Sequence, residues 1–173
     1  YDTSRALKSD LAEAWLGRDN VLFKLTPSDE ALAAYDKALA LKPGLAEAWL
    51  GRGTVFTELE RFDEALAACD KALALNPDLA ETWLGRGNVF TELDHYDEAL
   101  ADYDKALAFK PDLAEAWLAR GNLFVKLERY DEAFSAYDRA LALKPDLAEA
   151  WLGRGNLFVK LELYNEAPAA YDN

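Results

Sequence analysis

The sequence predicts an all-α protein built from stacked pairs of antiparallel helices. Its five tryptophans recur every 34 residues, at Trp15, Trp49, Trp83, Trp117 and Trp151. Four of its prolines keep the same spacing, at Pro43, Pro77, Pro111 and Pro145. A fixed period of this length is typical of arrays of helical hairpins, in which each repeat contacts mainly its neighbours.

One repeat shows both expected helices. The first covers about residues 79–93, and Asp78 followed by Glu81 predicts a capping box at its start. A polar turn at Asp94-His95 separates it from the second helix, about residues 97–110, which ends before a proline. Neither helix can hide its apolar face alone, so we expect each to pack on its partner and on the next repeat.

Small residues recur where we expect the helices to approach most closely. One column is always alanine, at Ala31, Ala65, Ala99, Ala133 and Ala167. Two glycine columns lie in the first helices, and only Ala119 interrupts the first of them: Gly17, Gly51, Gly85 and Gly153, then Gly53, Gly87, Gly121 and Gly155. Glycine inside a helix costs about 0.5–1 kcal/mol relative to alanine. Two explanations stay open: close approach of a ligand, or inheritance through recent duplication.

Arginine and aspartate recur in step with each other. The arginines are Arg18, Arg52, Arg86, Arg120 and Arg154, and the aspartates of the second helices are Asp36, Asp70, Asp104, Asp138 and Asp172. A guanidinium matches a carboxylate in shape and charge. Our hypothesis is a partly buried Arg–Asp ladder that sets the register of the helices, and the alternative is two independent solvated columns.

Composition excludes several classes of partner. The 19 Lys and Arg residues face 32 Asp and Glu residues, so the formal net charge is −13. Such a surface repels phosphate backbones and anionic membranes, so we expect neither nucleic acid nor a membrane as partner.

Cys69 is the single cysteine and no secretory signal is visible, which favours a cytoplasmic location. The chain starts without Met and stops partway through a repeat, so we expect it to be a segment of a longer protein.

Catalysis finds little support in the residues. His95 is the only histidine and lies in a turn, where two other repeats place Arg61 and Arg129. Cys69 occupies a column otherwise filled by tyrosine, which favours a packed core residue. With one His and one Cys, no Cys/His zinc site can form within the chain. Gly51-Arg52-Gly53 resembles part of a dinucleotide fingerprint but no strand precedes it. We therefore predict no enzyme activity, metal or cofactor.

The repeat resembles a known family. The pattern Trp49-x-x-x-Gly53-x-x-Phe56, followed by Ala65, Cys69, Ala72 and Pro77, resembles the tetratricopeptide repeat (TPR). The resemblance covers the whole chain as one array: a remnant second helix at 1–11, repeats at 12–45, 46–79, 80–113 and 114–147, and a truncated repeat at 148–173. It implies a right-handed superhelix of antiparallel helix pairs, with the first helices lining a concave groove. Repeat 12–45 departs most from the pattern, as is expected of a terminal repeat.

The resemblance also implies which residues line the groove. The groove positions of the family can be carried onto the first helices of this chain. There they form a glutamate column, a leucine column, a mostly amide column and an outer column of charged residues. The resulting candidates are Glu47, Leu50, Thr54, Glu81, Leu84, Asn88, Glu92, Glu115, Leu118, Asn122, Lys126, Glu149, Leu152 and Asn156, with Glu58 and Lys160 in the outer charged column.

These columns predict a scaffold that binds a protein or peptide with apolar anchors and basic flanks. A soluble acidic face without a specific ligand is the plainer alternative. The cationic clamp with which chaperone-binding members hold a carboxylate is absent, because Leu50, Leu84 and Glu81 stand at its positions. Two further alternatives stay open. The chain resembles the substrate-recruiting arms of O-linked glycosyltransferases, and its last repeat could stack end to end on another copy through Ala167, Ala170 and Tyr171.

Overall fold

The computed structural model describes residues 28–171, with side chains through residue 161. Over this range the chain forms helices and turns without any strand, which confirms the predicted all-α class. The helices are α2 (Ser28–Leu41), α3 (Ala46–Glu58), α4 (Phe62–Leu75), α5 (Ala80–Glu92), α6 (Tyr96–Phe109), α7 (Ala114–Lys126), α8 (Tyr130–Leu143) and α9 (Ala148–Tyr171). The remnant helix expected at 1–11, the first helix of repeat 12–45 and the side chains of the proposed end-to-end contact lie outside the described residues.

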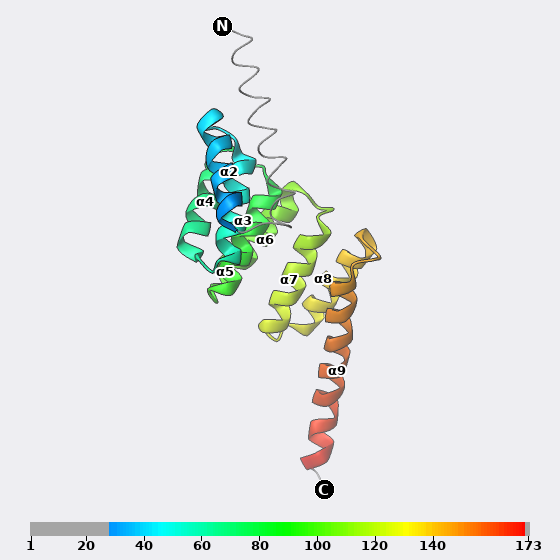
Figure 1. The fold of residues 1–173 in the computed structure, drawn as a ribbon. Coiled ribbons are helices and arrows are strands. Elements are labelled where there is room, and N and C mark those ends of the chain that lie inside the picture. The colour runs from blue at the N-terminus through cyan, green and yellow to red at the C-terminus, as the bar shows by residue number, and fades with distance from the viewer. Residues whose placement is uncertain (1–27, 172–173) are drawn as a thin grey trace. The chain divides into compact units, whose positions relative to one another are not determined.

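The chain divides into two compact units, Tyr1–Asp102 and Tyr103–Asn173, so the division falls inside α6. In the first unit α3 packs against α2, α4 and α5. In the second unit α7 packs against α8 and α9 (Figure 1). Within each unit, therefore, a first helix contacts both its hairpin partner and the first helix of the next repeat. That residues 1–173 form one array stays a prediction.

The tryptophan and proline columns are joined by a hydrogen bond. The indole Nε1 of Trp83 donates to the carbonyl oxygen of Pro77 at 2.7 Å, and Trp117 and Trp151 bond in the same way to Pro111 and Pro145 at 3.0 and 2.9 Å. Each bond fastens the first turn of a first helix to the end of the preceding repeat. The shared spacing of the two columns follows from this contact.

The Asp caps predicted at the starts of α5 and α7 are wrong. Helices α3, α5 and α7 have Leu45, Leu79 and Leu113 at their N-caps, with no side-chain capping hydrogen bond. Backbone groups close the first turn instead, as where the N–H of Ala48 donates to the carbonyl oxygen of Leu45 at 3.2 Å. Burial of Leu45, which is 6% exposed, fixes the direction in which the chain enters the helix.

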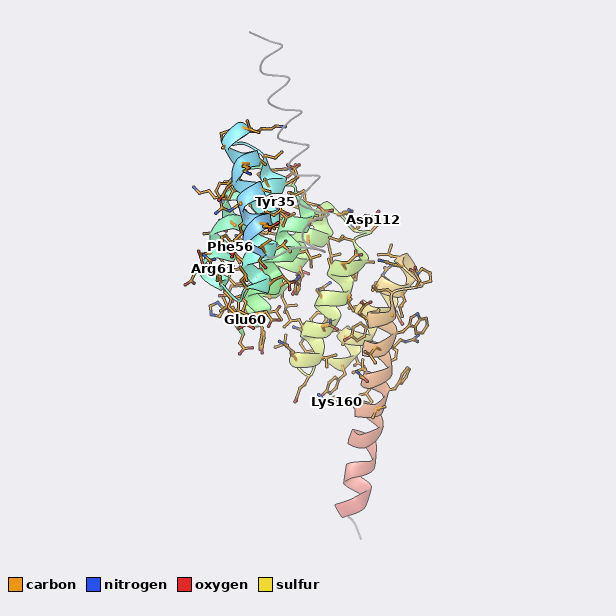
Figure 2. The ribbon with its side chains drawn as sticks, in the orientation of Figure 1. Tyr35, Phe56, Glu60, Arg61, Asp112 and Lys160 are labelled. Atoms are coloured by element: carbon orange, nitrogen blue, oxygen red, sulfur yellow. The ribbon has the colours of Figure 1, made fainter. Side chains whose placement is uncertain are left out.

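Each described hairpin turns through a residue with left-handed backbone conformation. Glu60, Asp94 and Glu128 have φ values of 56°, 59° and 58°. The following N–H reaches back across the turn, as from Arg61 to the carbonyl oxygen of Phe56 at 2.8 Å (Figure 2). The predicted turn at Asp94-His95 is confirmed.

Helix α9 departs from the pattern of the other repeats. It runs without interruption over Ala148–Tyr171, through the positions where the repeat places its turn. In α8 and α4 the residue before the second helix is an arginine that bonds a glutamate three residues on, as Arg129 does with Glu132. The corresponding residue is His95 in the α5–α6 hairpin and Leu163 in α9. Within the described residues 148–171, the expected turn is replaced by continuous helix.

Close packing around a tyrosine ring explains several of the glycines and agrees with the expected close approach of the helices. Tyr137 of α8 is 2% exposed, and its ring lies between α7 and α9. A Cβ added to Gly121 would lie 2.7 Å from Cε1 of Tyr137, and one added to Gly153 would lie 2.6 Å from its Cζ. Tyr35 lies against Gly51 in the same way. Glycine at these positions makes room for a tyrosine ring between successive first helices.

The Arg–Asp pairing predicted from the sequence is confirmed, although its burial is uneven. In each described case an arginine bonds the aspartate of the preceding repeat, with N–O distances of 2.7, 2.6, 3.2 and 3.2 Å. The arginine side chains are only 19–29% exposed, because each guanidinium lies over the tryptophan and phenylalanine of its own helix. The partner aspartates are 54–62% exposed, so the ladder is partly buried, as expected, with the burial on the arginine side. The pairs are Arg52–Asp36, Arg86–Asp70, Arg120–Asp104 and Arg154–Asp138.

Arg86 has a second partner that the sequence analysis did not single out. Asp102 replaces the alanine of the corresponding positions 68 and 136, is 3% exposed, and accepts bonds from Nε and Nη2 of Arg86 at 2.7 and 2.9 Å. Its hydrogen bonds to Asp102 and Asp70 raise the pKa of Arg86 above its ordinary value. In Arg52 and Arg120 the Nε atom is buried without a partner. Asp102 therefore completes a site that the other repeats leave incomplete.

No helix in the described part of the chain has the length and apolar character that crossing a membrane would require.

We predict opposite effects for alanine at two positions of one glycine column. Gly121→Ala should destabilise the protein by about 1–3 kcal/mol, because the added methyl overlaps the ring of Tyr137. Gly155→Ala should stabilise it by about 0.5–1 kcal/mol, since nothing lies within 4 Å of the added Cβ. Urea unfolding of both variants measures the difference, and equal shifts would contradict the packing role of the tyrosine.

We predict that Arg86→Ala costs about 3 kcal/mol, because it leaves the carboxylate of Asp102 buried without a partner. Arg120→Ala should cost about 1 kcal/mol, since its partner Asp104 is exposed. Adding Asp102→Ala to Arg86→Ala should recover most of the loss, because alanine already occupies the corresponding positions in other repeats. Equal urea midpoints for the Arg86 and Arg120 variants would contradict a special role of Asp102.

Candidate functional site

Each unit contains a hollow between two successive first helices and the second helix that lies between them in sequence. The first hollow, formed by α3, α4 and α5, has a volume of about 120 Å³. The second, formed by α7, α8 and α9, has a volume of about 370 Å³. The residues that line the first are Leu50, Gly53, Thr54, Thr57, Glu58, Cys69, Gly85 and Asn88, and those that line the second are Asn122, Val125, Tyr137, Glu149, Leu152, Gly153, Asn156, Leu157 and Lys160.

The two hollows use the same positions of the repeat. When the sequence is shifted by two repeats, lining residues of the first hollow coincide with lining residues of the second. The coinciding pairs are Thr54 with Asn122, Thr57 with Val125, Cys69 with Tyr137, Gly85 with Gly153, and Asn88 with Asn156. The hollow is therefore a product of the repeat itself, and each unit varies its lining.

The structure brings together part of the predicted groove in each unit. Leu50, Thr54 and Asn88 line the first hollow. Asn122, Glu149, Leu152 and Asn156 line the second, where the predicted charged residue Lys160 joins them from α9 (Figure 2). The remaining candidates lie on first helices but line neither hollow: Glu47, Glu81, Leu84, Glu92, Glu115, Leu118 and Lys126.

The floor of the second hollow contains residues that sequence reasoning treated as core alone. Tyr137 is buried, yet it faces the hollow together with Val125 and Leu157. Its hydroxyl donates to Oδ1 of Asn122 at 2.8 Å, and burial raises the pKa of the Tyr137 hydroxyl. The signal in the sequence was the tyrosine column in step with two glycine columns, which points to a ring held between helices.

Polar groups surround this floor in an arrangement suited to an extended chain. The amides of Asn122 and Asn156 can both donate to and accept from a peptide backbone. Glu149 and Lys160 supply one charge of each sign, and Leu152, which is 66% exposed, offers an apolar contact. The hollow thus combines an apolar floor with hydrogen-bonding and charged edges.

Cys69 and His95 are the two side chains that the sequence analysis considered for catalysis. Burial raises the pKa of the Cys69 thiol to about 12, so the sulfur is neutral at physiological pH and a poor nucleophile. His95 is exposed in its turn, with Nδ1 3.9 Å from Oε1 of Glu98, and it lines neither hollow. Across the described residues, no three His, Cys, Asp or Glu side chains are grouped so that they could hold a metal ion.

Comparison with solved structures agrees with this architecture. A thermophilic TPR protein of Thermus thermophilus superposes with a TM-score of 0.78 at 24% identity, covering 86% of this chain and 81% of that one. YrrB, described as a TPR protein with an unusual peptide-binding site, gives a TM-score of 0.63 at 27% identity and covers 86% and 76%. The first TPR of Spaghetti (RPAP3), bound to the HSP90 peptide SRMEEVD, gives 0.64 at 23% identity and covers 68% and 93%.

Family models match the repeats directly. A model described as TPR repeat matches residues 87–128 and 121–162, and one described as tetratricopeptide repeat matches residues 46–79. Together these matches span more than half of the chain. A search among curated proteins gave no significant match. The family models and the solved structures agree with the period, the helical hairpins and the glycine and proline columns: the chain belongs to the tetratricopeptide repeat family.

Proposed function

We propose that this chain is a protein-interaction scaffold that binds a peptide or protein segment in the hollows between its first helices. The observation that carries the proposal is the second hollow, which has a volume of about 370 Å³. Amides, an exposed leucine and two opposite charges surround its apolar floor. This combination can hold a peptide backbone through hydrogen bonds while a side chain is buried.

The family supports the same class of function. Tetratricopeptide repeat proteins are generally scaffolds without catalytic activity, and the related structure of YrrB is described as having a peptide-binding site. Repeats present extended surfaces, and here the same hollow recurs in both units. Repetition of one subsite suits an extended partner with several anchors.

Charge favours a basic partner. The chain carries a net charge of −13, and the hollows include Glu58 in the first unit and Glu149 in the second. Long-range attraction would speed the encounter with Lys- or Arg-rich segments and weaken as salt increases. Lys160 is the exception, so we expect the preference for basic residues to be weaker at the second hollow.

End-to-end association is a second candidate that one observation favours. Four large apolar side chains of α9 are 50–66% exposed: Trp151, Leu152, Phe158 and Val159. Such exposure is typical of a helix that another surface covers. The proposed role as a substrate-recruiting arm of a larger enzyme, such as an O-linked glycosyltransferase, uses the same peptide-binding hollows and would differ only in what lies beyond this chain.

We predict that a short peptide of alternating Leu and Lys binds the chain, whereas the matched Leu/Glu peptide and the acidic peptide SRMEEVD do not. Fluorescence anisotropy measures the affinity of each peptide at low salt and at about 0.15 M salt. The basic peptide should bind more weakly at the higher salt. Leu152→Lys should weaken binding roughly tenfold by removing an apolar contact and adding a repelling charge.

Leu143→Lys is the matched control, because Leu143 is 43% exposed and lines neither hollow. It should bind the basic peptide like the unmodified chain. If acidic peptides bound as well as basic ones, the electrostatic part of the proposal would fail. If both leucine variants bound like the unmodified chain, the second hollow would not be the site.

A further inference from the structure

The two hollows differ at the position of the buried tyrosine, and this difference bears on specificity. In the second, the ring of Tyr137 occupies the space between Gly121 and Gly153. In the first, the tyrosine position is Cys69, although the glycines at the two facing positions, Gly53 and Gly85, are kept. Helices α3 and α5 thus keep the two glycines that make room for an aromatic ring in the second hollow, but α4 supplies a cysteine in place of the ring.

The distances show where the space lies. A Cβ added to Gly153 would meet Cζ of Tyr137 at 2.6 Å, whereas one added to Gly85 would meet only Cδ1 of Leu50, at 3.5 Å. The sulfur of Cys69 lies on the other side, 3.1 Å from the corresponding point on Gly53. The unfilled part of the slot is therefore next to Gly85, with a flexible leucine beside it.

A second substitution accompanies the loss of the tyrosine. In the second hollow the Tyr137 hydroxyl donates to Asn122. The residue equivalent to Asn122 in the first hollow is Thr54, whose hydroxyl donates to the Leu50 carbonyl of its own helix at 3.2 Å. Both members of the tyrosine–asparagine pair are thus replaced in the same hollow, and the side chains left behind are smaller.

We propose that the first hollow is a subsite for an aromatic side chain of a bound peptide, next to a Lys or Arg of that peptide. This inference rests on the proposed peptide-binding function and names what one of its subsites accepts. The volume of about 120 Å³ is of the order of the cavity of roughly 150 Å³ that holds a benzene ring in another protein. The backbone of Gly85 gives the unfilled part of the slot a flat wall, which favours a ring over a branched aliphatic side chain.

Charge complementarity identifies the neighbour of the ring. Glu58 lines the first hollow, whereas the same column contributes Lys160 to the second. The Glu58 carboxylate is exposed, so it can pair with a cation of the peptide at the edge of the slot. The occupant is therefore a segment in which Phe or Tyr is adjacent to Lys or Arg.

The test compares three peptides that share Lys flanks and differ at one central residue, which is Phe, Leu or Ala. Isothermal titration calorimetry of the full chain should give a preference for Phe over Ala of roughly tenfold or more. Cys69→Tyr should abolish this preference, because its own ring fills the slot as Tyr137 does. Cys69→Ala keeps the slot open and should retain the preference for Phe. Glu58→Lys should weaken the binding of all three peptides.

Gly85→Leu is a second filling variant, built from the opposite wall of the slot, should Cys69→Tyr fail to fold. Thermal unfolding followed by circular dichroism checks that each variant is folded. An equal preference for Phe in the unmodified chain and in a folded filling variant would overturn the subsite, as would equal affinities of the Phe and Ala peptides. If none of the three peptides bound the unmodified chain, the proposed function itself would fail.

Discussion

The contact on which both the packing and the candidate site depend is a tyrosine ring held between two glycines. Tyr137 of a second helix lies against Gly121 and Gly153, one on each of the first helices that flank it. A larger residue at either glycine would displace the ring or separate the helices. The same ring forms the floor of the second hollow, so the distance between first helices and the shape of the site follow from one contact.

Arginine provides the polar counterpart of this contact. In the described arginine column, each side chain lies over aromatic rings of its own helix and reaches an aspartate of the preceding repeat; the column comprises Arg52, Arg86, Arg120 and Arg154. The exposed aspartate lowers the cost of the pair, because only the guanidinium loses most of its water. Repeat 80–113 is the exception, since Asp102 buries a second carboxylate against Arg86. The described repeats therefore combine weak ion pairs that recur with one buried ion pair that does not.

Much of the fold could be predicted from the period alone, because tryptophan, proline and alanine columns report contacts that every repeat must make. Elements that depend on a single repeat could not. The caps recur but were also misjudged, because Leu79 and Leu113, and not the aspartates before them, stand at the helix starts. The second partner of Arg86 follows from a single departure in sequence, at Asp102, and the uninterrupted helix α9 has no counterpart among the other described repeats.

The candidate site was predicted in part for the same reason. The asparagine and leucine columns pointed to lining residues, but the floor residue Tyr137 looked like ordinary core, and the glycines were explained by a ligand or by inheritance.

The most direct test of the tyrosine–glycine contact is a double-mutant cycle of Gly121→Ala and Tyr137→Cys followed by urea unfolding. The cost of Gly121→Ala should fall by at least about 1 kcal/mol when the ring is absent, and an unchanged cost would show that the ring does not set the spacing of the helices.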